Sequence, residues 1–74
     1  MSAVEGVRET TLHRLDAIIT RLENPNARMD LDTRVYQHRA YFENLKVLRR
    51  LGCWDELNTY YTLFNSYLKR RGDL

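Results

Sequence analysis

Few residues in this 74-residue chain have the types and spacing that catalysis or metal binding requires. Cys53 is the one cysteine, and its distance in sequence from His13 and His38 does not match the ligand spacing of a zinc site. His13 and Asp16 lie three residues apart, which on a helix is typical of a surface hydrogen bond. Neither a glycine-rich phosphate loop nor a nucleophile motif occurs in the sequence. We therefore expect a protein that is not an enzyme and that uses no metal and no cofactor.

His38 and Cys53 each have a structural interpretation and a functional alternative. His38 falls within an apolar stripe, so we expect a buried or interfacial histidine with a hydrogen-bond partner. Its protonation would then make association sensitive to pH between about 5 and 7. Cys53 follows a glycine and is expected to be a small apolar turn residue. The alternative is a reactive thiol, because the positive end of the following helix lowers the pKa of a nearby thiol.

The aromatic side chains are concentrated in the second half of the chain. All five tyrosines, both phenylalanines and the tryptophan lie between Tyr36 and Tyr67. The last predicted helix carries two neighbouring stripes at helical spacing, one of Trp54, Leu57, Tyr61, Phe64 and Leu68, and one of Tyr60, Leu63 and Tyr67. A helix in such a bundle buries only about three residues in seven, so the two stripes exceed what a core requires.

This surplus of aromatic residues can be interpreted as a thick core or as a protein-binding face. In a thick core the tyrosine hydroxyls would reach out to water. In a binding face the same rings would be rigid anchors, and we favour this interpretation because a small chain without crosslinks gains stability from a partner surface. The predicted protein-binding residues are Tyr36, Tyr41, Trp54, Tyr60, Tyr61, Phe64 and Tyr67.

Basic residues gather at the ends of the two last predicted helices. Lys46, Arg49 and Arg50 end one helix, and Lys69, Arg70 and Arg71 end the other, where cations complement the helix dipole. In an antiparallel pair these ends lie at opposite poles, so they do not form one patch. We expect Arg49, Arg50, Arg70 and Arg71 to steer encounter with an acidic partner surface. The alternative is a dimeric nucleic-acid-binding regulator that contacts phosphates with both basic ends.

Three amphipathic helices must position these residues. The patterns predict helices over about residues 3–23, 31–51 and 54–71, with Asn24-Pro25 ending the first. Asp30 or Asp32 is expected to cap the second helix, and Gly52 to end it in a left-handed conformation. The predicted inward positions of the second helix are Leu31, Val35, Phe42, Leu45 and Leu48.

The predicted fold is all-α, a single domain over residues 1–74. We expect a small antiparallel three-helix bundle, or a hairpin of the second and third helices with the first helix laid across it. The first helix could instead cross to a neighbouring subunit, and we expect a dimer. The chain is 43% hydrophobic and 30% charged, which fits a folded domain, and no apolar run is long enough for a membrane helix.

Together these features predict a small non-catalytic protein–protein interaction module. Its role would be that of an adaptor, an assembly factor, or an inhibitor or anti-activator of a larger protein. The expected partner is another protein, a second copy of the chain, or both, and no membrane is involved. One free cysteine and no export signal predict a cytoplasmic location. The formal net charge of +2 does not by itself indicate a nucleic-acid partner.

Overall fold

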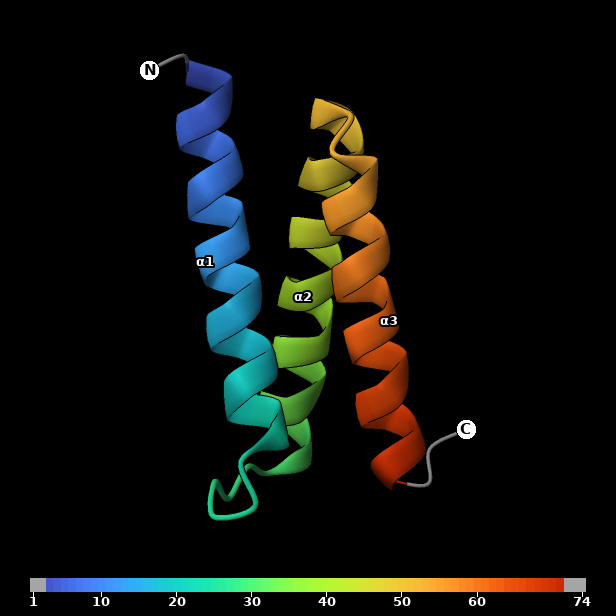
Figure 1. Cartoon of the computed structure of the whole chain (residues 1–74). Helices are drawn as coiled ribbons and strands as arrows, with labels where there is room; N and C mark the ends of the chain where they lie inside the picture. The colour runs from blue at the N-terminus through green and yellow to red at the C-terminus, as the bar shows by residue number, and fades with distance from the viewer. Residues whose placement is uncertain (1–2, 72–74) are drawn as a thin grey trace.

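The computed structural model describes residues 3–71 and consists of three helices joined by two short connections (Figure 1). Helix α1 spans Ala3–Glu23, α2 spans Leu31–Leu51 and α3 spans Trp54–Arg71. Successive helices run in opposite directions, so α1 and α3 point the same way (Figure 1). The all-α, three-helix architecture predicted from the sequence is confirmed, and the helices lie where the apolar patterns placed them.

The start and end of α2 follow from local hydrogen bonds. Asp30 caps its N-terminus, because the Asp30 carboxylate accepts a 2.7 Å hydrogen bond from the backbone N–H of Thr33. At the other end Gly52 adopts a left-handed conformation with φ of 75°. The next N–H, of Cys53, then donates to the carbonyl of Leu48 over 2.9 Å, which closes the helix and turns the chain into α3.

The core lies along the axis between the three helices. Its buried hydrophobic side chains among the described residues are Leu15, Ile19, Leu22, Tyr41, Leu45, Leu48, Phe64 and Tyr67. Tyr41 stacks on Phe64 with a centroid distance of 4.9 Å, and His38 meets the same ring edge-on at 5.2 Å. The α2–α3 side of the core is therefore aromatic, whereas α1 contributes aliphatic side chains.

The structure corrects the predicted inward face of α2. Leu31, Val35 and Phe42 were predicted to point into the core, yet all three are exposed, and Leu31 exposes 75% of its surface. Tyr41, Leu45 and Leu48 form the buried stripe instead. The buried stripe therefore passes through Tyr41, next to Phe42 in the sequence, and the N-terminal turns of α2 contribute little to the core.

The inward face of α3 takes residues from both predicted stripes. Trp54 and Tyr61, which were predicted as contact residues, are exposed. Tyr67, from the neighbouring stripe, is buried, and Tyr60 packs against the core. Phe64 is buried, although it was predicted as a contact residue. The core thus takes parts of both stripes and leaves other parts on the surface.

Helix α1 packs closely along α2, and its contacts with α3 include the Arg8–Glu56 and Asp16–Tyr60 pairs beside the shared core. A hairpin of α2 and α3 with α1 laid across it was one expected arrangement, but α1 approaches α2 more closely than α3 does. The large rings between α2 and α3 hold those two backbones apart, whereas smaller side chains separate α1 from α2. Among residues 3–71 no helix is long and apolar enough to cross a membrane.

Candidate functional site

The structure divides the seven predicted contact aromatics into three groups. Tyr41, Phe64 and Tyr67 are buried inside the chain, and Tyr60 is half-buried. The exposed ones are Tyr36, Trp54 and Tyr61, which show 68%, 55% and 52% of their surfaces. Only the exposed group lies where another protein could touch it in this structure, so the seven residues do not form one surface.

Tyr41 and Tyr67 have structural partners for their hydroxyl groups. The Tyr41 hydroxyl donates to the backbone carbonyl of Tyr60, and burial raises the pKa of Tyr41. The Tyr67 hydroxyl lies 3.1 Å from Nε2 of His38 and accepts from the Arg71 guanidinium at 3.3 Å. These two tyrosines connect α2 with α3 and line the core, and their hydroxyls bond to protein groups, whereas the thick-core interpretation had them reaching out to water.

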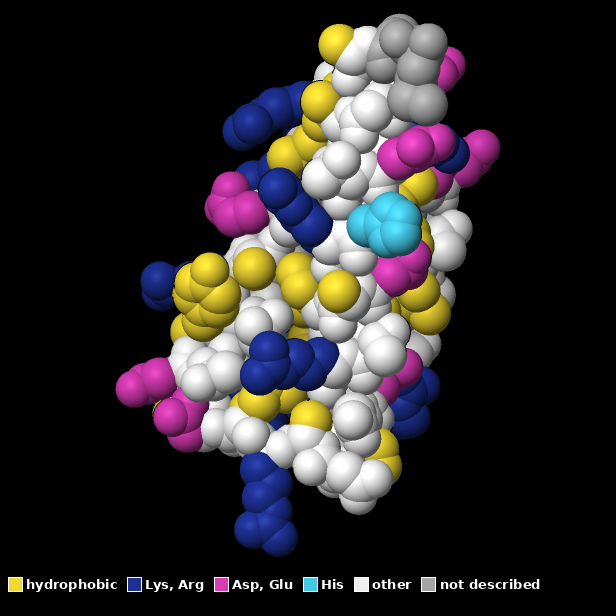
Figure 2. All heavy atoms as spheres, turned by 90° about the vertical axis from the view of Figure 1, so that its left-hand side faces the viewer, with side chains coloured by type: hydrophobic (Ala, Val, Ile, Leu, Met, Phe, Trp, Pro, Cys, Tyr) yellow, Lys and Arg dark blue, Asp and Glu magenta, His cyan; other side chains and the backbone are white. Residues whose placement is uncertain are grey.

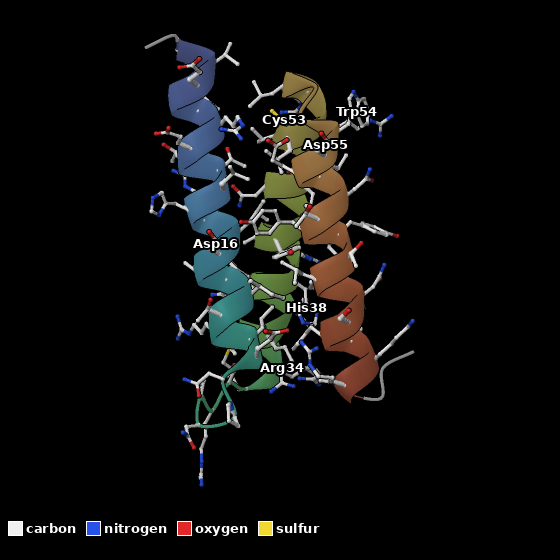
Figure 3. The ribbon with its side chains drawn as sticks, viewed as in Figure 1. Asp16, Arg34, His38, Cys53, Trp54 and Asp55 are labelled. Atoms are coloured by element: carbon white, nitrogen blue, oxygen red, sulfur yellow. The ribbon has the colours of Figure 1, made fainter. Side chains whose placement is uncertain are left out.

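Tyr60 connects α3 with α1. Its hydroxyl donates a 2.5 Å hydrogen bond to the carboxylate of Asp16, which Figure 3 places on the side of α1 facing α3. Burial, followed by the hydrogen bond and the negative charge of Asp16, raises the pKa of Tyr60 to about 12. Asp16 is thus engaged with a tyrosine from another helix, whereas the sequence had suggested a local contact with His13.

The exposed aromatic Tyr61 borders a groove between α2 and α3. We call this hollow the α2–α3 groove, and its volume is 370 Å³. Its lining residues are Phe42, Leu45, Lys46 and Arg49 from α2, and Leu57, Asn58 and Tyr61 from α3. The groove therefore has an apolar floor and a basic rim on the α2 side. Trp54 lies one turn before Asn58, at the start of α3 and on the side away from α1 (Figure 3).

The groove continues along α2 toward its N-terminus. A second hollow shares Phe42 and Lys46 with it and adds Val35, His38, Arg39 and Glu43. Five α2 residues that border one hollow or the other follow one another at steps of three or four, namely Val35, Arg39, Phe42, Lys46 and Arg49. We call these five residues the α2 stripe. Phe42 and Lys46 were not among the predicted contact residues, because Phe42 was expected to face the core and Lys46 to complement the helix dipole.

The two basic helix ends lie at opposite ends of the molecule, as the antiparallel arrangement predicted (Figure 1). Arg49 and Arg50 border a hollow beside Lys46 near the end of α2. Arg70 forms an ion pair with Glu23, and the Arg71 guanidinium lies 5.6 Å from the centre of the Tyr67 ring. On the α1 side of the molecule, charges of both signs are interspersed with hydrophobic side chains (Figure 2).

The chemistry-bearing residues do not gather into a reactive site within residues 3–71. In that range no cluster of three or more histidine, cysteine or acidic side chains could hold a metal ion. Cys53 is half-buried at the turn between α2 and α3, and His38 lies further down, between the two helices (Figure 3). Comparisons with protein-family models, curated proteins and solved structures found no match, so the site has to be interpreted from its own geometry.

Proposed function

We propose that this protein is a small, non-catalytic protein-interaction module that binds a partner through the α2–α3 groove. The observation that carries the proposal is the exposure of Phe42 and Tyr61 on the two sides of that groove. Both rings would lose contact with water if a partner side chain entered between them. Trp54 extends the same face of α3 by a turn.

Large exposed rings beside a groove are typical of protein-binding surfaces. Exposed apolar patches are costly in a monomer, and aromatic anchors in pockets contribute most of the binding free energy of many interfaces. Phe42 also packs edge-on against the buried Phe64 at 4.9 Å, so the core holds its ring in place. A ring held in this way loses little conformational entropy on binding.

Such a module would act by covering a surface of its partner. This role fits an adaptor, an assembly factor or an inhibitor in the cytoplasm, where a free thiol such as Cys53 is stable. The basic side chains Lys46 and Arg49 at the rim would speed encounter with an acidic partner. Arg70 and Arg71 lie at the far end and would take part only in a partner that spans the whole molecule.

The dimeric nucleic-acid regulator has less support. Its two basic clusters lie at opposite ends, and at the α3 end Arg70 is paired with Glu23. A phosphate track would have to bridge both ends of a molecule 38 Å long. Phosphate contacts would also make affinity fall steeply with salt, whereas binding by an apolar groove depends on salt only weakly.

Quantitative affinity capture from the native host tests the proposal. We compare the wild-type chain with Tyr61→Ala, which removes a groove ring, and with Tyr36→Ala, which removes an exposed ring that does not border the groove. We expect one set of partners to be lost with Tyr61→Ala and retained with Tyr36→Ala. Equal recovery by all three proteins, each shown by circular dichroism to be folded, would contradict the proposed groove.

A further inference from the structure

We infer that the partner segment is an acidic amphipathic helix, which lies in the α2–α3 groove and along the α2 stripe as a fourth helix. This inference rests on the proposed function and specifies the chemistry of the partner. Its basis is the combination of the apolar α2–α3 groove, a second hollow that continues it along α2, and an excess of positive charge along the α2 edge.

The dimensions and the floor of the site fit a helix. The α2 stripe runs from Val35 to Arg49, which at 1.5 Å per residue is about 21 Å, or roughly four turns of a partner helix. The apolar floor comes from both helices, through Leu45 on α2 and Leu57 on α3. In a four-helix bundle an additional helix packs into the groove between two neighbouring helices. Apolar side chains at every third or fourth position of the partner would reach that floor.

The charges along the α2–α3 groove and the α2 stripe favour an acidic partner. Three residues of the α2 stripe are cationic, namely Arg39, Lys46 and Arg49, and the hollows contain one carboxylate, Glu43. Glu43 lies 3.1 Å from Lys46 in a pair whose side chains are both more than 60% exposed, so water screens it strongly. Carboxylates along the edges of a partner helix would meet an edge with an excess of positive charge.

The same charges argue against a second copy of this chain in the groove. In a symmetric dimer the same patch faces itself, so Arg39, Lys46 and Arg49 of one copy would approach those of the other. A single-stranded nucleic acid would satisfy the cations but not the floor. Leu45 and Leu57 are aliphatic, so beyond the rings of Phe42 and Tyr61 the floor offers nothing on which successive bases could stack.

Two designed peptides test the inference. Both are helical 18-residue peptides with leucines at positions i, i+3, i+7, i+10 and i+14, and they differ only in carrying glutamate or lysine at the flanking positions. Binding is followed by fluorescence anisotropy of the labelled peptide at low and at physiological salt. We expect the glutamate peptide to bind at least about tenfold more tightly than the lysine peptide.

Variants of the chain locate the binding site. Asn58 is an exposed residue in the groove wall, and Asn58→Glu places a negative charge there without touching the core. We expect Asn58→Glu to weaken binding of the glutamate peptide by about fivefold or more and to strengthen binding of the lysine peptide. Tyr61→Ala should weaken binding of the glutamate peptide, and the control Tyr36→Ala should leave this binding unchanged. As a control, circular dichroism must show that each variant keeps the helix content of the wild type.

The outcomes separate this inference from the proposed function. Equal affinity for both peptides, or tighter binding of the lysine peptide, would overturn the inference that the partner is an acidic helix. A single-stranded oligonucleotide that displaces the glutamate peptide and binds more tightly would also overturn it. If neither peptide binds while host capture still depends on Tyr61, the inference fails and the proposed function stands. If capture is insensitive to Tyr61, the proposed function itself is wrong.

Discussion

A tyrosine can enter a protein core only when its hydroxyl finds a hydrogen-bond partner, because a buried unpaired hydroxyl loses its bonds to water. Tyr41 finds this partner in the backbone carbonyl of Tyr60, and Tyr60 finds it in the carboxylate of Asp16. Both partners come from a different helix. No buried side-chain nitrogen or oxygen within residues 3–71 lacks a hydrogen bond. Two tyrosines that could have been surface anchors are therefore part of the framework.

Alkaline titration should reveal this difference between tyrosines. The pKa of Tyr41 is raised by burial, and the pKa of Tyr60 is raised to about 12 by burial and by Asp16. Tyrosines in the unfolded chain ionise near pH 10, so above that pH the unfolded state holds fewer protons than the folded state. The contribution of these two tyrosines to stability is thus fully present below about pH 10 and is lost as the pH rises toward 12. Ultraviolet absorbance of tyrosinate should show Tyr41 and Tyr60 ionising late, together with unfolding.

Asp16→Asn is the matched control for this titration. It keeps an oxygen that can accept the hydrogen bond of Tyr60 but removes the negative charge, so we expect the pKa of Tyr60 to fall while burial still holds it above its ordinary value. Tyr60→Phe should remove one late ionisation altogether. A single transition of all five tyrosines near pH 10 in the folded protein would contradict these assignments.

At the scale of the helices, different kinds of contact join the three pairs. Aromatic rings fill the space between α2 and α3, while smaller side chains allow α1 to approach α2 closely. α1 and α3 are joined by polar contacts along their length, through Arg8 and Glu56 at 2.6 Å and through Asp16 and Tyr60. The Arg8–Glu56 contact lowers the pKa of the Glu56 carboxyl. These contacts fix the register of α1 on α3, where apolar packing is least extensive.

Two glycine substitutions should have opposite effects on helix stability. Gly52 has a φ of 75°, which is unfavourable for any residue with a Cβ, so Gly52→Ala should destabilise the fold by about 1 kcal/mol. Gly6 lies inside α1, and a Cβ there would meet no atom within 4 Å, so Gly6→Ala should stabilise it by about 0.5–1 kcal/mol. Urea unfolding followed by circular dichroism measures both. Shifts of the same sign would show that the turn at Gly52 differs from the one described.

The ends of the helices were predicted well from the sequence, whereas the face that each helix buries was predicted poorly. Helix ends depend on local signals, such as the Asp30 cap and the left-handed Gly52, which can be recognised from neighbouring residues. Which face of a helix is buried depends on contacts between helices. Phe42 and Tyr41 are adjacent, and the hydroxyl of Tyr41 becomes acceptable in the core only because α3 presents the Tyr60 carbonyl. Periodicity alone could not reveal that contact, so the groove residue Phe42 was assigned to the core.

The whole molecule combines a small core with a large surface. It measures 38 × 19 × 17 Å, with a radius of gyration of 12.9 Å. The helices bury one short hydrophobic cluster and leave Phe42 and Tyr61 beside an open groove. A single core in a domain of this size contributes only about 3–5 kcal/mol of net stability. Binding of a partner to the folded state alone would add to that value, by about 2.7 kcal/mol at a partner concentration one hundred times Kd.

Two leucines of α2 allow the core boundary to be tested with the same chemical change. Leu48 is fully buried and Leu31 is 75% exposed, so Leu48→Ala should cost about 2–5 kcal/mol, and Leu31→Ala less than about 0.5 kcal/mol. The net free energy of unfolding of the whole domain is of similar size. Much of the Leu48→Ala protein should therefore be unfolded already at the start of a thermal melt, whereas Leu31→Ala should melt like the wild type. If Leu31→Ala were equally destabilising, the start of α2 would have to be covered in solution by a second copy. The melting temperature would then rise with protein concentration.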